Sequence, residues 1–367
     1  MGKAISILGI RGVPAAHGGF ETFAEHLAIF LHTRGWKVTV YCQEVGGRPV
    51  FWDEWHGVRR VRVSVKGGGP ASTVIFDWKA TKLASREHAG VVLTLGYNTA
   101  VFCARLRLSS LPNVINMDGI EWQRAKWGAV QRTWFWLNEW AGCWLGNHLV
   151  ADHPEIKRHL ESRVSGRKIT VIPYGADSVT CADEAPVRSL GLVPRQFATV
   201  IARAEPENSL LEIVSGFSRK HRGIQLAVLG KYDRAHAYQL RVLEAASDEV
   251  KFLGAIYAQN VVSALRFHSL LYIHGHQVGG TNPSLVEALG AGNAVLAHNN
   301  RFNRWVAGDG AAYFDGTDQF TAAFERLVGD EGQLAKMRTA SRQRHRDHFT
   351  WAHVLGEYEK LLARLHP

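Results

Sequence analysis

The segment HGHQVGGTNPSLVEALGAG, residues 274–292, combines residue types that suit the binding of an anion. It joins an apolar run to a helical pattern through a Gly-rich turn. Asn282 is a good N-cap, and Pro283 suits the first helical position, where a missing N–H has no cost. We therefore expect a helix that begins at Pro283 and whose N-terminal dipole attracts an anion. The candidate donors are the backbone amides of Gly280, Thr281, Ser284 and Leu285, one of which Asn282 can occupy itself.

Three side chains extend this chemistry. Glu287 lies one turn into the helix, too close to a phosphate site to bind phosphate, so a ribose diol is its expected partner; the alternative is a solvated helix glutamate. Arg203 ends the apolar run FATVIARA, and its guanidinium offers forked, permanently charged donors for phosphate oxygens. Lys231 follows the run IQLAVLG and is a second candidate cation, although exposed lysines are usually only solvated.

A second Gly-rich segment, GIRGVPAAHGGFETFAEHLA, covers residues 9–28. Gly18 and Gly19 would allow the backbone to approach a ligand closely, just before a helix that starts with Phe20 and Glu21. The alternative is an ordinary loop between a strand and a helix. The segment has no GxGxxG pattern, so a dinucleotide-binding fingerprint is not supported.

Short apolar runs, each followed by a helical pattern, position these loops. The first series lies at residues 4–10, 37–42, 90–96, 113–117, 147–151 and 169–175, and the second at residues 197–204, 224–230, 250–254, 270–276, 293–298 and 311–314. Alternation of strands and helices predicts parallel sheets covered on both faces, and two series predict two doubly wound α/β domains. In such sheets ligands bind beyond the carboxyl ends of the strands, where every Gly-rich segment here occurs.

Residues 174–196 lose the periodicity and gather Pro, Gly and Asp, which marks the joint between the domains. We expect an N-terminal domain at residues 1–178, a C-terminal domain at residues 179–347 and an amphipathic helix within residues 348–367.

The composition is that of a folded, soluble protein, with 46% hydrophobic and 21% charged residues in a chain of 367. Its four cysteines show no CxxC pairing, which argues against a zinc site or a disulfide framework and is compatible with a reducing cytoplasm. The N-terminus does not look like a signal peptide, and no window of about 18 apolar residues is present. The formal charge of +10 favours an anionic partner, namely nucleic acid, an anionic lipid surface or a phosphorylated substrate.

Several motifs resemble the retaining glycosyltransferases of the GT-B fold in the large family numbered four. VIPYGAD, ARAEPENS, VKFLGAI, TNPSLVEALGAG, FTWAHVLGEYEKLL and GVPAAHGGFETFAEHLA resemble family segments and keep their order over nearly the whole chain. The resemblance implies two Rossmann-like domains facing a cleft, a nucleotide-sugar domain in the C-terminal half and a final helix that returns to the N-terminal domain. It also implies that the turn carrying Ile256 holds the base. Two positions depart from the family: its first E-x7-E glutamate falls on Gly279, and the lysine of its PEK segment falls on Asn208.

A narrower resemblance rests on GIRGVPAAHGGFETF, MDGIEWQRAKW, ARAEPEN and HGHQVGGTNPSLVEA. These segments look like a bacterial subgroup whose members include rhamnosyltransferases that extend a lipid-diphosphate-linked glucose during surface polysaccharide assembly. The loss of an acid at Gly279 fits a donor other than the usual hexoses, with dTDP-rhamnose as a candidate.

Asp118 follows a predicted strand, where the family commonly has a histidine near the reacting sugar. Asp118 would orient the acceptor hydroxyl or stabilise positive charge that develops at the anomeric carbon; its alternative is a turn aspartate before Gly119. Arg203 is the second catalytic candidate. The resemblance implies no enzyme nucleophile, because the departing phosphate is thought to accept the proton.

Residues 122–144 contain tryptophans mixed with cations, which suits the headgroup zone of a membrane. An aromatic core with a stacking site for an acceptor sugar is the alternative. The residues assigned to the acceptor or membrane side are Glu21, Trp122, Arg124, Lys126 and Trp127.

The sequence therefore predicts a metal-independent retaining glycosyltransferase that acts in bacterial polysaccharide assembly. We expect it to use a nucleotide-sugar as substrate, with no other cofactor, and a glycan or lipid-linked acceptor at the inner face of the cytoplasmic membrane, without nucleic acid. His274 and His276 alternate on an extended segment, so their side chains should diverge and form no metal site. The alternatives are a Rossmann oxidoreductase, which lacks its fingerprint, and a non-catalytic GT-B protein that binds polyanions or polysaccharide.

Overall fold

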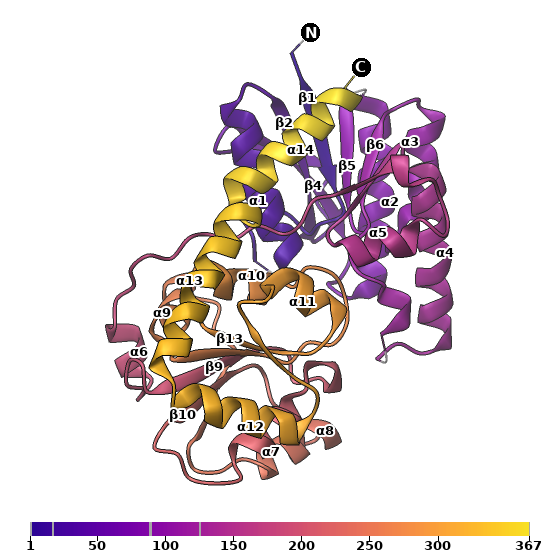
Figure 1. Ribbon diagram of the computed structural model, residues 1–367. Coiled ribbons are helices and arrows are strands. Elements are labelled where there is room, and N and C mark those ends of the chain that lie inside the picture. Colours follow the sequence, from indigo (N-terminus) through magenta and orange to yellow (C-terminus); the bar gives the residue numbers. More distant parts are fainter. Residues whose placement is uncertain (1, 17, 88–89, 125, 367) are drawn as a thin grey trace. The chain divides into compact units, whose positions relative to one another are not determined.

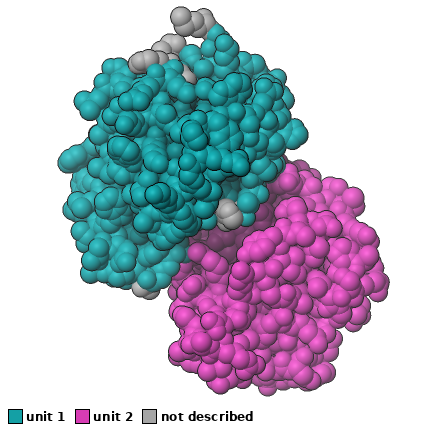
Figure 2. Space-filling model, turned by 180° about the vertical axis from the view of Figure 1, so that it is seen from behind, with its two compact units in different colours: residues 1–174, 351–367 teal, residues 175–350 magenta. Residues whose placement is uncertain are grey.

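The computed structural model describes residues 2–16, 18–87, 90–124 and 126–366. The chain forms two compact units (Figures 1 and 2), Met1–Tyr174 with Trp351–Pro367 as unit 1 and Gly175–Thr350 as unit 2. Each unit is an α/β unit built on a mostly or wholly parallel sheet. The predicted α/β class with two doubly wound domains is confirmed.

The described part of unit 1 has an eight-stranded sheet in the order β3-β4-β2-β1-β5-β6-β7-β8. Its strands are β1 (Ala4–Leu8), β2 (Lys37–Val45), β3 (Phe51–Trp55), β4 (Val58–Val65), β5 (Val91–Leu95), β6 (Asn113–Asn116), β7 (His148–Ala151) and β8 (Ile169–Val171). The helices and short 3-10 segments are α1 (Gly19–Thr33), α2 (Pro70–Glu87), η1 (Ala100–Cys103), α3 (Ala104–Leu108), η2 (Glu121–Gln123), α4 (Ala129–Leu145), α5 (Pro154–Leu160), η3 (Gly166–Lys168) and α14 (Trp351–Leu365).

Sequence analysis did not predict the β3–β4 hairpin at one edge of this sheet. β3 and β4 are antiparallel, and His56 and Gly57, both with positive φ, connect them. The segment FWDEW of β3 is largely exposed and lacks the apolar run that marks the buried strands. An ion pair between Arg60 and Asp53, with 2.7 Å between Nε and Oδ1, joins the two strands instead.

The C-terminal helix α14 belongs to unit 1 (Figure 1). It packs one apolar face into the hydrophobic core of that unit. Its buried side chains recur at helical spacing and are Val354, Leu355, Tyr358, Leu361 and Leu362. The Tyr358 ring lies 4.6 Å from that of Phe23 on α1, and the Tyr358 hydroxyl accepts a hydrogen bond of 2.7 Å from Asn116 Nδ2.

The units divide after Tyr174 and Thr350, a few residues from the expected boundaries at 178 and 347. The observed boundaries differ from the expected ones because two short segments of unit 2 pair with each other. Ala176 bridges Thr350, and the Ala176 N–H donates to Phe349 O over 2.8 Å. This pairing keeps the first and the last residues of unit 2 together in that unit.

The described part of unit 2 has a six-stranded parallel sheet in the order β11-β10-β9-β12-β13-β14. Its strands are β9 (Phe197–Ile201), β10 (Gln225–Leu229), β11 (Val250–Gly254), β12 (Leu271–His274), β13 (Val295–His298) and β14 (Ala312–Phe314). The helical segments are α6 (Ala185–Ser189), η4 (Pro206–Asn208), α7 (Leu210–Phe217), α8 (Ala237–Glu244), α9 (Gln259–His268), α10 (Pro283–Gly290), α11 (Arg301–Ala307), α12 (Thr317–Val328) and α13 (Glu331–His348).

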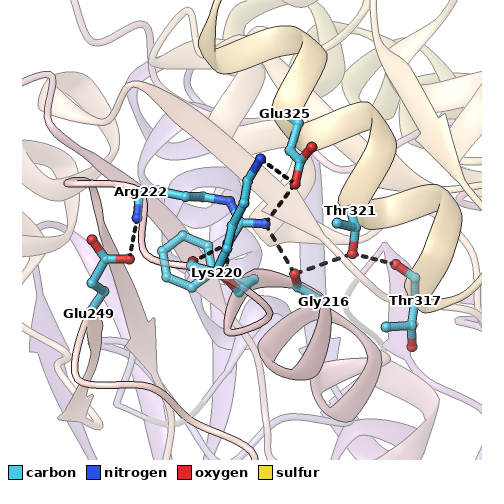
Figure 3. Close-up of polar contacts among 8 residues, drawn as sticks. Gly216, Lys220, Arg222, Glu249, Thr317, Thr321 and Glu325 are labelled. Carbon is cyan, nitrogen blue, oxygen red and sulfur yellow. Dashed lines mark hydrogen bonds and ion pairs between the residues drawn. The ribbon is translucent and has the colours of Figure 1, made fainter.

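A buried arginine connects the elements on one side of unit 2 (Figure 3). The Arg222 guanidinium pairs with Glu325 on α12 at 3.2 Å and donates to Phe217 O, while the Arg222 amide donates to Glu249 over 2.8 Å. Thr321 of α12 donates to Gly216 O over 3.2 Å. These bonds join α7 and α12 to the residue that precedes β11.

No helix in the described ranges has the length and hydropathy needed to cross a membrane.

The packing of α14 predicts a large effect of truncating Leu362, whose side chain is fully buried. Leu362→Ala should lower the free energy of unfolding by about 2–5 kcal/mol, because it removes buried methyl groups and leaves a cavity. Lys360→Ala on the same helix removes a mostly exposed side chain and should change the free energy by less than about 0.5 kcal/mol. Denaturant unfolding measures both, and equal losses in the two variants would show that α14 is not docked as described.

Candidate active site

The polar candidates of unit 2 meet at the point where its strand order reverses. The chain runs from β9 outward to β10 and β11 and then returns to β12 on the other side of β9. In open α/β sheets ligands bind at such a switch point. A cavity of about 170 Å³ lies beyond the carboxyl ends of β9 and β12. Its lining is Val200, Ile201, Ala202, Arg203, Asn208, Ile273, His274, Gly275, His276 and Asn282. We call this the switch-point cavity.

Helix α10 begins as the sequence predicts, with Asn282 as the N-cap and Pro283 as its first residue. Asn282 Oδ1 accepts from the Ser284 amide over 3.0 Å, and Asn282 O accepts from the Leu285 amide over 3.1 Å. The expectation that the Ser284 and Leu285 amides point at an anion is therefore corrected. The N-cap already uses both donors, which leaves the preceding turn and the helix dipole to attract an anion.

Glu287 is not the solvated helix glutamate of the alternative interpretation. It forms an ion pair with Arg266 of α9, whose side chain is only 4% exposed. Arg266 Nη2 also donates to Ser284 Oγ over 3.2 Å, and Ser284 Oγ lies 2.6 Å from the hydroxyl of Tyr272. Sequence analysis missed Arg266, because nothing in the helical segment around it indicates a partner 21 positions along the chain.

Asn208, which stands where the family has lysine, has a structural role. It is buried, its Nδ2 donates to Arg203 O over 2.8 Å, and its Oδ1 lies 2.6 Å from His276 Nδ1. An amide oxygen can only accept a hydrogen bond, so His276 Nδ1 carries the proton. Gly275 is required here, because a Cβ would collide with the carbonyl oxygen of Asn208. Asn208 thus holds the loop after β9 against the loop after β12, while the Arg203 side chain is exposed at the cavity.

His274 ends β12 as a buried, neutral imidazole. Burial, followed by the positive environment of His276, His298 and Arg266, holds the pKa of His274 well below its ordinary value of 6.5. Its Nε2 has no hydrogen-bond partner among the described residues. The His274 and His276 rings lie 6.1 Å apart, so the expectation that they diverge is corrected: on an extended segment, residues two positions apart point to the same face.

The remaining candidates of unit 2 lie around this cavity or along the same sheet edge. Gly280 is half-buried and Thr281 is buried in the turn before α10. Lys231 is exposed after β10, and Ile256 follows β11 and packs on an apolar cluster beneath it. Both belong to strands beyond β9, and neither is among the described residues that line the switch-point cavity.

In unit 1, the loop after β1 borders a cavity of about 370 Å³ whose lining includes Arg11, Gly12, Arg62 and Glu21. Glu21 is buried and its Oε2 accepts from the Ala16 amide over 3.2 Å, which ties the loop to the first turn of α1. Gly18 is the N-cap of α1 and Gly19 its first residue. At Gly18 the backbone is extended and a Cβ would meet nothing within 4 Å, so neither conformation nor packing requires glycine there.

Asp118 follows β6 at the carboxyl edge of the unit 1 sheet in a left-handed conformation, with φ of 51°. Its amide donates to Asn116 Oδ1 over 2.9 Å, which fixes this turn. Burial, reinforced by the charges of Glu139, Asp118 and Glu121, raises the pKa of Tyr97. A non-glycine residue held in this conformation stores strain, which clusters at functional sites.

The residues assigned to the acceptor or membrane side are engaged within the fold. Trp122 Nε1 donates to Glu139 over 3.0 Å, and Trp127 Nε1 donates to Glu121 over 3.2 Å. Arg124 pairs with Glu121 at 2.7 Å, and both side chains are mostly buried. The Lys126 ammonium lies 4.5 Å from the centre of the Trp127 ring. These contacts order the segment between β6 and α4.

Two family models match the chain. Residues 2–177 match a domain of unknown function (DUF1972), and residues 192–344 match the family described as glycosyl transferases group 1. The second match lies within unit 2. No curated protein sequence matches the chain.

Several solved structures are similar to nearly the whole chain. Sucrose-phosphate synthase from Thermosynechococcus elongatus is similar with a TM-score of 0.82 and 16% identity, covering 99% of both chains. Anabaena Alr3699/HepE in complex with UDP has a TM-score of 0.75 and 12% identity, over 99% of this chain and 100% of that one. A glycosyltransferase from Rickettsia africae has a TM-score of 0.71 and 13% identity, over 99% and 98%.

The protein therefore has the GT-B fold that the sequence motifs resemble, and the match to glycosyl transferases group 1 lies in unit 2, which contains the switch-point cavity. The family match and the fold together support a glycosyltransferase. In the described residues, no group of three or more His, Cys, Asp or Glu side chains is arranged to hold a metal ion.

The histidines of this domain predict a loss of stability on acidification. Burial lowers the pKa of His274, His298 and His345 in the folded protein. As pH falls through about 6.5, the unfolded chain takes up protons that the folded chain does not, so stability decreases by up to about 1.4 kcal/mol per pH unit for each histidine.

This loss should be seen as a falling melting temperature between about pH 7.5 and 5.5. His274→Gln should flatten the dependence, whereas His236→Gln, which changes an exposed histidine of the same unit, should not. A melting temperature independent of pH in the wild type would contradict a buried, neutral His274.

Proposed function

We propose that the protein is a metal-independent retaining glycosyltransferase of bacterial polysaccharide assembly, with a nucleoside-diphosphate sugar as donor and a lipid-diphosphate-linked glycan as acceptor. The observation that carries the proposal is the switch-point cavity of the glycosyl transferases group 1 domain. Arg203 and the capped start of α10 lie at its edge, and Glu287 follows one turn later. We infer that the protein acts at the inner face of the cytoplasmic membrane and needs no cofactor besides the donor.

The donor diphosphate would lie against the start of α10, where the helix dipole and the cationic Arg203 offset its charge. Glu287 would accept hydrogen bonds from the ribose hydroxyls. Its pairing with the buried Arg266 holds the carboxylate in one place, which lowers the entropy lost on binding. The similar HepE protein of Anabaena has been solved with UDP and with UDP-glucose, which supports this assignment of unit 2.

In the proposed reaction, the bond between the anomeric carbon and the diphosphate oxygen breaks. A bond forms from the same face of that carbon to the acceptor oxygen, and the acceptor proton passes to the departing phosphate. Arg203 would stabilise the negative charge that develops on the leaving group. Asp118 of unit 1, held in its strained turn, would orient the acceptor hydroxyl or stabilise positive charge at the anomeric carbon.

L-Rhamnose is the proposed donor sugar. At Gly279 the backbone has φ of 100°, so a side chain would be strained there, and the family's sugar-binding glutamate is absent. A Cβ at this position would lie 3.5 Å from His276 Nε2, so the imidazole occupies the adjoining space. This arrangement favours a deoxy sugar, because it removes an acceptor that would otherwise bind a hydroxyl.

Nucleotide binding tests the donor site. One of dTDP, UDP and GDP should bind best in calorimetry, and NAD should not bind. Arg203→Ala should weaken that binding about tenfold or more, because it removes a charged hydrogen-bond donor to phosphate. Glu287→Gln, which keeps an acceptor for Arg266, should weaken it by a similar factor.

Arg219→Ala is the control, since it removes an exposed cation of unit 2 that is paired with Asp318. Its affinity should equal that of the wild type. Salt-sensitive binding of polyanions without any nucleotide binding would favour the alternative, a non-catalytic GT-B protein that binds polyanions or polysaccharide.

A donor assay tests the finer proposal. With a lipid-diphosphate-linked glucose acceptor, dTDP-rhamnose should be consumed faster than UDP-glucose, the product should keep the donor's anomeric configuration, and EDTA should not reduce the rate. Asp118→Asn should lower kcat about a hundredfold or more with little change in nucleotide affinity. An inverted product would overturn the retaining assignment, and preference for UDP-glucose would overturn the assignment of rhamnose.

A further inference from the structure

Helix α4 of unit 1 exposes large apolar side chains to solvent. The outward residues are Val130, Trp134, Trp136, Leu137 and Trp144, each more than a third exposed, and Trp144 is 63% exposed. Four of them follow the spacing i, i+4, i+7 and i+14 and therefore share one side of the helix. The inward side is filled by Asn138, Glu139, Gly142 and Cys143. We call the outward side the α4 face.

Trp136 and Trp144 of the α4 face form a ladder with the half-buried Trp140 between them. The Trp136 and Trp140 ring centres are 6.1 Å apart, and those of Trp140 and Trp144 are 5.4 Å apart, both with edge-to-face geometry. Trp134 is fixed at the other end by a hydrogen bond of 2.8 Å from Nε1 to Asn98 O. The rings are thus held in place before any partner arrives, so binding costs little side-chain entropy.

Cations border this ladder. The Arg163 guanidinium lies 4.9 Å from the centre of the Trp140 ring, and Lys168 Nζ donates to Cys143 O over 2.6 Å at the end of the helix. Burial, followed by the charge of Arg107, lowers the pKa of Lys168, and Arg107 is itself exposed on α3. Arg132 is exposed on the helix itself.

No carboxylate on the outward side of α4 balances Lys168, Arg107 and Arg132. The structure describes every residue of α4, and Glu139 is the helix's single acidic residue. Glu139 is 1% exposed and is paired with Arg163 at 2.5 Å and with His159 at 3.0 Å. The surface therefore presents tryptophan and positive charge together.

We propose that the α4 face docks on the surface of a membrane that contains anionic lipid. Indole rings settle in the headgroup zone, where the apolar body and the N–H are both accommodated, and arginine and lysine meet lipid phosphate. A second copy of the chain is disfavoured as the occupant, because it would bring two basic rims together.

The sequence analysis assigned residues 122–144 to the headgroup zone. Of these, Trp122, Arg124 and Trp127 are used within the fold, and the α4 face supplies the exposed tryptophans. The inference rests on the proposed function, in which the acceptor is linked to a membrane lipid. Membrane docking itself does not depend on catalysis. A failure of vesicle binding would leave the nucleotide-binding result intact, and the reverse is also true.

Co-sedimentation of the full chain with vesicles tests the proposal. Vesicles of phosphatidylglycerol with phosphatidylcholine should bind the wild type, and vesicles of phosphatidylcholine alone should bind it much less. Trp136→Ala/Trp144→Ala should reduce the partition onto anionic vesicles about tenfold or more, because it removes the apolar anchors. Arg107→Glu/Arg132→Glu should reduce it by at least about tenfold, through loss of attraction to anionic lipid.

Trp52→Ala is the matched control. Trp52 lies on the edge strand β3, is 64% exposed and also has a cation near its ring, Arg59 at 5.8 Å. This variant should bind vesicles like the wild type, and all variants should keep the wild-type melting temperature.

Two outcomes would overturn the proposal. One is anionic vesicles that fail to bind the wild type or that bind the Trp136/Trp144 variant equally well. The other is a dimer in light scattering that this variant disrupts while vesicle binding is unchanged, which would identify a second copy as the partner of the α4 face.

Discussion

The ion pair of the buried Arg266 guanidinium is the interaction on which the structure around α10 depends. A charge with 4% exposure is costly unless it is paired, and its partners here are Glu287 and Ser284 of α10. The Arg266 carbonyl also accepts from Asn293 Nδ2 over 2.7 Å, which holds the turn after α10. Helix α10 is thereby fixed at both ends against α9. The Glu287 carboxylate is held in position because the buried charge of Arg266 needs a negative partner.

Hydrogen bonds that involve side chains also fix the loops after β9 and β12. Asn208 and Ser209 reach across to the loop after β12 through His276 Nδ1 and Gly275 O, at 2.6 and 2.7 Å. From the other side, Asn300 and Asn303 donate to the His276 carbonyl over 3.0 and 2.8 Å. The walls of the switch-point cavity are therefore rigid without a ligand, and the exposed Arg203 is the part of it left to adapt. Preorganisation of this kind places binding groups at low entropic cost.

Unit 1 divides its unusual aromatic content between two roles. Trp122 and Trp127 satisfy buried or half-buried carboxylates, and so they belong to the structure of the segment after β6. Trp136 and Trp144 have no such task in the fold and lie exposed on α4. Helix α4 can leave these rings exposed because its inward side packs through small and polar residues, Gly142 and Asn138 among them. The fold is thus stable without burying the outward rings.

The sequence by itself determined the features that depend on neighbours along the chain. The apolar runs that became strands, the N-cap at Asn282 and the start of α10 at Pro283 were all legible, because periodicity and capping are local. The β3–β4 hairpin was not, since an exposed edge strand with an ion pair carries no apolar run. Only the tertiary structure decided the partners: Arg266 for Glu287, Asn208 for His276, and which tryptophans face inward. These pairs lie 21 to 68 positions apart, and their contacts come from the packing of whole elements, which no local spacing encodes.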